Sequence, residues 1–226
     1  MMLAAAKVAL SSAYILAALA SCPAPSPPAT AILTFTTVPP DISNVKSSKA
    51  LGGYHISTTF SHSLNEMFTV GGLTVSDFAP EYLIHFSLTQ DAEGTQVCLS
   101  PASVEITLKY APRVFIASEA PEGSCRYRDT LTHEMRHVNT DIITFNELLP
   151  QLKQAVQDAL DHMQPIGPMA PASMDKAQNI ITDKIRDTVV KKVDEIEQIR
   201  FNRQQQIDTR QEYMRASKAC PDNTSP

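Results

Sequence analysis

The chain has 226 residues, of which 43% are apolar and 19% are charged. This length and apolar content suit one domain with a buried core, and they exclude wholesale disorder. The formal net charge of −5, the absence of tryptophan and the 6% aromatic content exclude a typical nucleic-acid-binding protein, which needs a basic surface and often aromatic rings for stacking.

The N-terminus is typical of an export signal. Lys7 precedes an apolar run over residues 8–20 that is too short for a comfortable transmembrane helix. Residues 19–22 (LASC) resemble a bacterial lipobox, in which Cys22 would be lipidated and become the mature N-terminus. Ordinary cleavage after residues 18–20 (ALA) is the alternative. Both interpretations predict an exported protein.

We therefore expect residues 1–22 to be a lipoprotein-type signal peptide. Residues 23–30 (PAPSPPAT) are predicted to form a semi-rigid, proline-rich tether. A lipid on Cys22 would make the membrane a partner and would hold the mature protein in the bacterial periplasm or at the outer membrane.

After the tether the sequence is strand-like for about 90 residues, with the two-residue periodicity of half-buried strands. Alternation of apolar and polar side chains, or a short apolar run, predicts strands at YHISTTF (54–60), EYLIHFSL (81–88), VEITLKY (104–110) and RVFIAS (113–118). Short segments containing glycine or proline separate them, as expected of turns.

From Asp129 the periodicity becomes that of an amphipathic helix, with apolar residues three or four apart from Leu131 to Leu152. Asp129 or Thr130 is expected near its N-cap. Pro150 is expected to kink this helix or to divide it in two.

Residues 164–171 (QPIGPMAP) are predicted to be a loop. A second helical run follows over residues 173–213, which is long for a globular domain. We expect it to break near Phe201 or to project as an arm.

Strands therefore precede helices along the chain, which is the order of an α+β fold. We expect residues 31–163 to form a domain with a β-rich N-terminal half followed by a long helix. Residues 164–171 would connect it to a C-terminal helical segment, residues 172–226.

The stretch THEMRHVNTD (132–141) contains a His-Glu-x-x-His motif. His133 and His137 lie one helical turn apart, so their imidazoles point the same way and can share one metal ion. Glu134 is rotated by about 100° from His133, which places it beside the metal as a general base. The alternative is a charged helix that matches the motif by chance.

Catalytic zinc needs three protein ligands and one open position. The candidates for the third ligand are Asp141, Glu147, Asp158, His162, Asp208 and Glu212. Asp141 is on the same helix as the histidines, so we expect it to orient an imidazole or to face solvent. We choose Glu212, which lies beside Tyr213, a possible oxyanion donor. The alternative is that residues 208–213 (DTRQEY) are a solvated helix end.

The motif and its surroundings resemble the zincin superfamily of metallopeptidases, over about residues 104–145. The export signal, the β-rich N-terminal half, Cys125 and the motif helix are also similar to the bacterial family described as predicted secreted Zn-dependent proteases. That family's later Tyr-Asp-x-x-Thr-x-His-Gly stretch has only a partial counterpart in residues 206–214 (QIDTRQEYM). The resemblance implies a zincin-like catalytic domain, Zn²⁺ as cofactor and peptidase activity.

The four cysteines are Cys22, Cys98, Cys125 and Cys220. If Cys22 carries lipid, export favours a disulfide between Cys98 and Cys125, which would join the strand region to the start of the motif helix. Cys220 would then be free or would compete for a partner. Spacing alone leaves the connectivity open.

The leading hypothesis is an exported, membrane-tethered zinc metallopeptidase that hydrolyses a peptide or protein of the cell envelope. One alternative is a non-enzymatic envelope lipoprotein whose long helix, residues 173–213, docks a partner. Another is a zinc hydrolase acting on a non-peptide amide, such as a cell-wall link. Metal content separates the first two hypotheses, and substrate assays separate the third.

Overall fold

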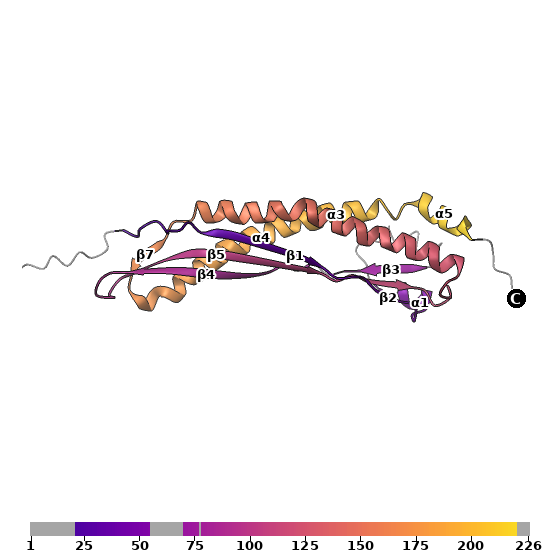
Figure 1. The fold of residues 1–226 in the computed structure, drawn as a ribbon, viewed down its shortest axis with the longest axis horizontal. Coiled ribbons are helices and arrows are strands. Elements are labelled where there is room, and N and C mark those ends of the chain that lie inside the picture. Colours follow the sequence, from indigo (N-terminus) through magenta and orange to yellow (C-terminus); the bar gives the residue numbers. More distant parts are fainter. Residues whose placement is uncertain (1–20, 55–69, 77, 221–226) are drawn as a thin grey trace, which may run out of the picture.

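The computed structural model describes residues 21–54, 70–76 and 78–220, and it has the α+β architecture that the strand and helix order predicts. Figure 1 shows an elongated molecule in which long strands run side by side and long helices accompany them. Most of the expected signal peptide, most of the expected strand at 54–60, and His55 and His62 lie outside the described residues.

The larger sheet is built around its longest strand. Its members are β1 (Thr30–Thr37), β4 (Glu81–Gln90), β5 (Val97–Tyr110) and β7 (Ile166–Met169). The order is β1-β5-β4, with β1 parallel to β5 and β4 antiparallel to it, and β7 pairs antiparallel with the beginning of β5.

A smaller sheet continues the larger one. Its order is β2-β6-β3, where the strands are β2 (Asp41–Ser43), β6 (Arg113–Ile116) and β3 (Gly72–Val75). Backbone bonds from Val38 N–H to the Tyr110 carbonyl (2.9 Å) and from Asp41 N–H to the Pro112 carbonyl (3.0 Å) carry the pairing across the junction. A short helix, α1 (Ser48–Leu51), lies beside this sheet at one end of the molecule (Figure 1).

The predicted alternation on the strands is confirmed. On β5 the apolar series Val104, Ile106, Leu108 and Tyr110 is at most 1% exposed. On β4, Tyr82, Ile84 and Phe86 pack against the same core, whereas Leu88, predicted to share their face, is exposed. One face of the larger sheet therefore supports the helices, because period-two side chains all point to one side.

The motif helix, α3, extends from Cys125 to Asp161. Its N-cap is Ser124, whose hydroxyl accepts a hydrogen bond from Tyr127 N–H at 3.1 Å, so the expected cap at Asp129 or Thr130 is wrong. The helix begins before its apolar stripe because Ser124 satisfies the first free backbone donors. The helix also continues through Pro150, which is exposed, and it bends along its length without dividing (Figure 1).

The second long helix, α4 (Met174–Gln205), is not a projecting arm. Ile181, Ile185 and Ile196 are buried in the same core cluster as the inner faces of β5 and α3. The helix ends at Gln205, not near Phe201, and a short turn leads to α5 (Arg210–Ala219). Thr209 caps α5 by accepting a hydrogen bond from Glu212 N–H at 3.2 Å.

The segment predicted as a loop, residues 164–171, contains strand β7. Val97 of β5 pairs with Met169, so the connection between α3 and α4 also completes the sheet. A short 3-10 turn, η1 (Pro171–Ser173), then leads into α4. The prediction missed this strand because a glycine and a proline lie within its four residues and masked its sequence pattern.

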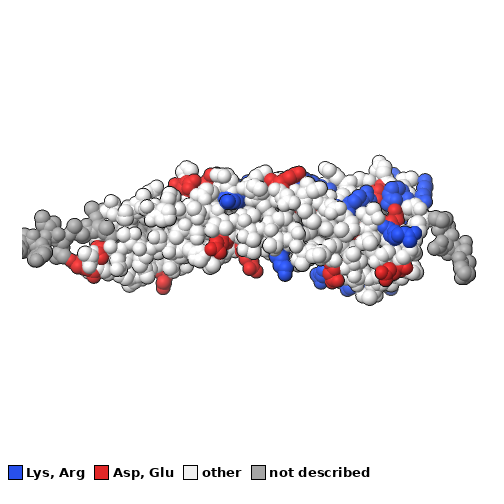
Figure 2. Space-filling view, viewed as in Figure 1, with Lys and Arg blue, Asp and Glu red and all other residues white. Residues whose placement is uncertain are grey.

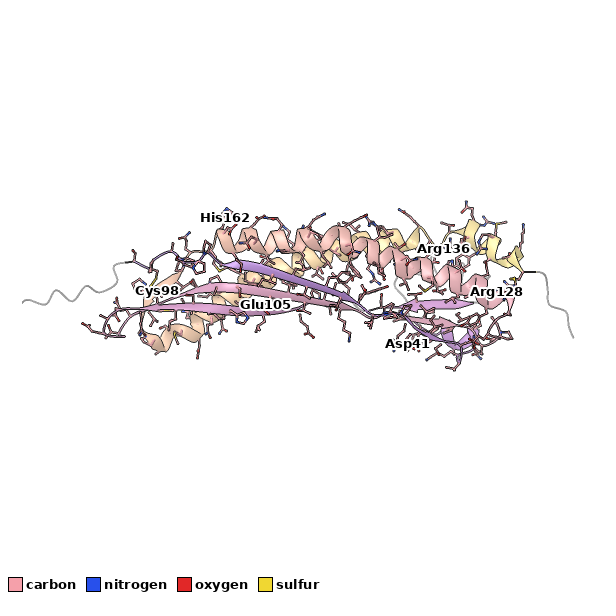
Figure 3. The ribbon with its side chains drawn as sticks, viewed as in Figure 1. Asp41, Cys98, Glu105, Arg128, Arg136 and His162 are labelled. Atoms are coloured by element: carbon pink, nitrogen blue, oxygen red, sulfur yellow. A yellow bond between two sulfur atoms is a disulfide. The ribbon has the colours of Figure 1, made fainter. Side chains whose placement is uncertain are left out.

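The structure has two disulfides, Cys22–Cys98 and Cys125–Cys220, so the predicted Cys98–Cys125 pair is wrong. The reason is the length of β5 and β6, which separate the two cysteines along the molecule. Figure 3 shows Cys98 near one end of the molecule and Arg128, three residues after Cys125, near the other. A Cys22 sulfur bonded to Cys98 cannot also carry a thioether-linked lipid, so the disulfide and the predicted lipidation are mutually exclusive states.

Candidate metal centre

The HExxH motif lies on α3, as predicted, and it meets the turn between α4 and α5. His133 Nε2 and His137 Nε2 are 3.3 Å apart. Asp208, in the turn, places its Oδ1 atom 3.0 Å from His133 Nε2 and 3.1 Å from His137 Nε2. Three atoms with metal-binding lone pairs therefore converge on one point, from two segments about 70 residues apart in the sequence.

The spacing of these atoms fits a small tetrahedral cation. Ligand atoms about 2.0–2.1 Å from zinc at tetrahedral angles are about 3.3 Å from one another. The three separations in this cluster are 3.0, 3.1 and 3.3 Å. Two imidazole nitrogens and one carboxylate are also a donor set that zinc accepts in catalytic sites.

Asp208 thus replaces Glu212 as the candidate third ligand. Glu212 Oε1 lies 3.2 Å from His133 Nδ1, the ring nitrogen that points away from the cluster. Asp208 lies in the non-helical turn before α5, whereas Glu212 lies within α5. Their carboxylates therefore approach opposite nitrogens of the same His133 imidazole. A carboxylate behind a ligating histidine fixes the orientation of the ring and raises its basicity.

Glu212 is itself held by two arginines. Arg136, one turn along from His133 on α3, and Arg215, on α5, both donate to its carboxylate. The hydrogen bond from Arg215 lowers the pKa of Glu212 to about 2, with a further contribution from Arg136, although partial burial opposes the shift. Figure 3 shows Arg136 where α3 meets the C-terminal helices, and Figure 2 shows basic and acidic side chains intermixed at that end of the molecule.

Glu134 is buried beside the cluster, with an exposed fraction of 4%. Thr74 Oγ1 on β3 donates a hydrogen bond to its Oε2 atom at 2.8 Å. Burial raises the pKa of Glu134 above its ordinary value, and the two neighbouring histidines oppose that shift. A carboxylate with a raised pKa is a stronger proton acceptor, as a general base requires.

Strand β3 leaves space for Glu134 at one position. A Cβ atom on Gly72 would lie 2.5 Å from Glu134 Oε1 and 2.6 Å from Thr130 Cγ2, so no larger residue fits without displacing the glutamate. Neither Gly72 nor Thr74 stands out in the sequence, where glycine is expected only of a turn. No local pattern reveals either role, because both depend on the packing of β3 against α3.

The charges at the cluster stabilise one another. Burial alone would raise the pKa of Asp208, but hydrogen bonds from His133 and His137 lower it to about 2. Burial alone would lower the pKa of His137, but the hydrogen bond to Asp208 and the charge of that carboxylate raise it to about 9. The pKa of His133 is raised by the same partner, also against the effect of burial.

Tyr213, next to Glu212 on α5, is also close enough to the cluster to feel its charges. Burial raises the pKa of its hydroxyl to about 12, and the charges of Asp208 and Glu134 contribute to the shift. The hydroxyl therefore stays protonated at neutral pH, and a protonated hydroxyl can donate a hydrogen bond to developing negative charge.

Asp141 is neither a ligand nor a solvent-facing residue. It is 1% exposed and accepts hydrogen bonds from Tyr110 OH and Ser76 Oγ, both at 3.0 Å. Arg200 on α4 forms an ion pair with it, with Nε 2.7 Å from Oδ1 and an NH2 nitrogen 2.9 Å from Oδ2. This network lies behind His137.

The remaining candidates lie in other contacts. Glu147 pairs with Arg203 at 2.7 Å, and Asp158 accepts a hydrogen bond from Gln154 at 2.7 Å. His162 is the C-cap residue of α3. The structure therefore does not bring these residues to the cluster.

Comparison with known proteins finds no match to this chain among protein-family models, curated proteins or solved structures. Within the described ranges, none of the helices has the length and apolar character needed to cross a membrane. Support for a function therefore comes from the geometry of the cluster and from the His-Glu-x-x-His motif.

Proposed function

We propose that this protein is a zinc-dependent metallopeptidase that acts on a peptide or protein of the cell envelope. One observation carries the proposal: His133 Nε2, His137 Nε2 and Asp208 Oδ1 converge at zinc-ligand spacing, with buried Glu134 beside them. The N-terminal sequence, which is typical of an export signal, supports a location in the cell envelope. The protein would be attached there through its N-terminal region.

The chemistry follows from the neighbours of the cluster. Bound zinc would polarise the scissile carbonyl and lower the pKa of a coordinated water toward neutrality. Glu134 would accept the proton from the attacking water and return it to the leaving amine. Thr74 holds Glu134 in place through the hydrogen bond to Oε2. The Tyr213 hydroxyl would donate a hydrogen bond to the oxyanion that forms at the attacked carbonyl carbon.

The alternative of a non-enzymatic lipoprotein whose long helix docks a partner stays a hypothesis. The isoleucines Ile181, Ile185 and Ile196 of α4 pack within the protein's own core, so they do not offer a docking face. A peptide bond and another amide present the same carbonyl group to this site, so the substrate class is tested with peptides and cell-wall fragments in parallel.

The test is the zinc content of purified variants, measured by elemental analysis without chelator. We expect one equivalent in the wild-type protein and little in His133→Ala, His137→Ala and Asp208→Asn, because each loses a ligand. Glu134→Gln should retain zinc and lose hydrolysis, since an amide does not accept the water's proton.

Glu147→Gln is the matched control, because this carboxylate on α3 is paired with Arg203 away from the cluster. It should bind zinc and hydrolyse substrate like the wild type. A wild-type protein that takes up no zinc on addition would rule out the proposal. Full zinc in the His133→Ala and His137→Ala variants would place the metal elsewhere.

A further inference from the structure

Gln204, in the last turn of α4, lies between His137 and Asp141. It is 3% exposed. Its Oε1 atom contacts His137 Nδ1, and its Nε2 atom contacts both Asp141 Oδ1 and the backbone carbonyl of His137, the latter at 3.1 Å. A buried amide thus touches the motif helix at three points.

Only one orientation of this amide satisfies its neighbours. The backbone carbonyl of His137 can only accept a hydrogen bond, and both oxygens of Asp141 act as acceptors in the ion pair with Arg200. An amide oxygen at that end would face two acceptors, which is costly for buried groups. The amino group must therefore occupy that end, and Oε1 must face the imidazole.

The orientation of the amide fixes the tautomer of His137. Because Oε1 can only accept, Nδ1 must carry a proton, and in the neutral ring Nε2 must carry the lone pair. Nε2 is the nitrogen that lies 3.1 Å from Asp208 and 3.3 Å from His133 Nε2. The lone pair is thus aimed at the cluster.

We infer that Gln204 is a positioning residue for the metal, held in its working orientation by the Asp141–Arg200 ion pair. The inference rests on the proposed zinc site and deepens it. It also explains why a charged pair lies buried behind His137. The two ligating imidazoles then have different supports, a carboxylate (Glu212) for His133 and an oriented amide for His137.

The test compares Gln204→Met with Gln198→Met, an exposed position on the same helix. Zinc affinity is measured by competition with a chromophoric chelator, after circular dichroism has established that each variant is folded. We expect Gln204→Met to bind zinc about 10- to 100-fold more weakly than the wild type, the usual effect of removing a partner of a ligating histidine. Gln198→Met should bind like the wild type. Gln204→Leu is a second apolar variant if the first does not fold.

A second measurement separates positioning from general stability. Nitrogen NMR of zinc-loaded, histidine-labelled protein should show metal at Nε2 of His137 and a slowly exchanging proton at Nδ1. In the folded Gln204 variant that proton should exchange faster. Equal zinc affinities for the wild type and Gln204→Met, or metal at Nδ1 of wild-type His137, would overturn the inference while leaving the metal site intact. A wild type that binds no zinc would overturn both.

Discussion

Gly72 is the residue at which the packing of β3 most directly controls the candidate site. We expect Gly72→Ala to retain zinc but to lose about 100-fold or more in hydrolysis rate. The added Cβ would lie 2.5 Å from Glu134 Oε1 and must displace the carboxylate that we propose as general base. Steady-state kinetics and zinc analysis on the same preparation provide the measurement.

Gly71→Ala is the matched control for that substitution. Its Cβ would meet only Thr130 Oγ1, at 3.6 Å, which is an ordinary van der Waals contact. Activity that survives in Gly72→Ala at the level of Gly71→Ala would mean that the position of Glu134 is not critical for the reaction.

The titration of the ligands predicts a pH dependence. The pKa of His137 in the metal-free protein is raised from 6.5 to about 9, so this group stabilises the folded state fully below pH 6.5, and its contribution is lost as pH rises through 9. Zinc must displace protons from the same site, so its affinity should increase over that interval.

The measurements are thermal unfolding of metal-free and zinc-loaded protein, and chelator competition, at several values between pH 6.5 and 9. The metal-free protein should lose stability with rising pH, and the zinc-loaded protein should lose less. An affinity that is flat across this interval would show that no proton is displaced from the histidines.

Among the elements, α5 depends on a cross-link for its place beside α3. Cys125 at the start of α3 is bonded to Cys220 directly after α5, and the Asp208 turn lies just before α5. Replacing both cysteines by serine should lower the free energy of unfolding by about 4–5 kcal/mol, an upper value from loop-closure entropy. Zinc affinity should fall as well, because the segment carrying the third ligand becomes less ordered.

The Cys22–Cys98 pair is the control for this prediction. It closes a loop of similar length but lies away from the cluster. Its double serine variant should lose comparable stability in chemical denaturation and keep its zinc affinity. Equal losses of affinity in both double variants would mean that global stability, and not the position of α5, determines metal binding.

The elements differ in how far the sequence predicted them. The strands β4 and β5 and the HExxH face of α3 follow from local periodicity, which depends on burial along a single element. The third ligand does not, because Asp208 reaches the histidines only where the chain leaves α4 and turns into α5. The roles of Gln204 and Gly72 depend on contacts between elements, so no spacing rule reveals them. The disulfide pairing also could not be predicted, because it depends on which cysteines lie at the same end of the elongated fold.

At the scale of the whole molecule, the state of Cys22 determines whether the N-terminus can be anchored to a membrane by a lipid. Cys22 either carries a lipid, as the lipobox predicts, or keeps the bond to Cys98 seen in the structure. Mass spectrometry of protein purified from membranes and from the soluble fraction, with and without reductant, decides between them. We expect a peptide pair joined by the Cys22–Cys98 bond, and a diacylated Cys22 with a free Cys98 would contradict it.

The two disulfides enclose separate stretches of chain, residues 22–98 and 125–220, and neither loop crosses the other. The proposed peptidase activity would expose the protein to cleavage by its own copies. A cut within either loop would leave the two pieces covalently joined, and the sheets and helices would still hold their partners. Only a cut in residues 99–124 would divide the structured chain into separate molecules. This stretch contains most of β5 and all of β6, whose backbone is engaged in sheet hydrogen bonds, and the turns over residues 117–124 that lead into α3. A cut in those turns is therefore the one that the disulfides and the sheets do not guard against.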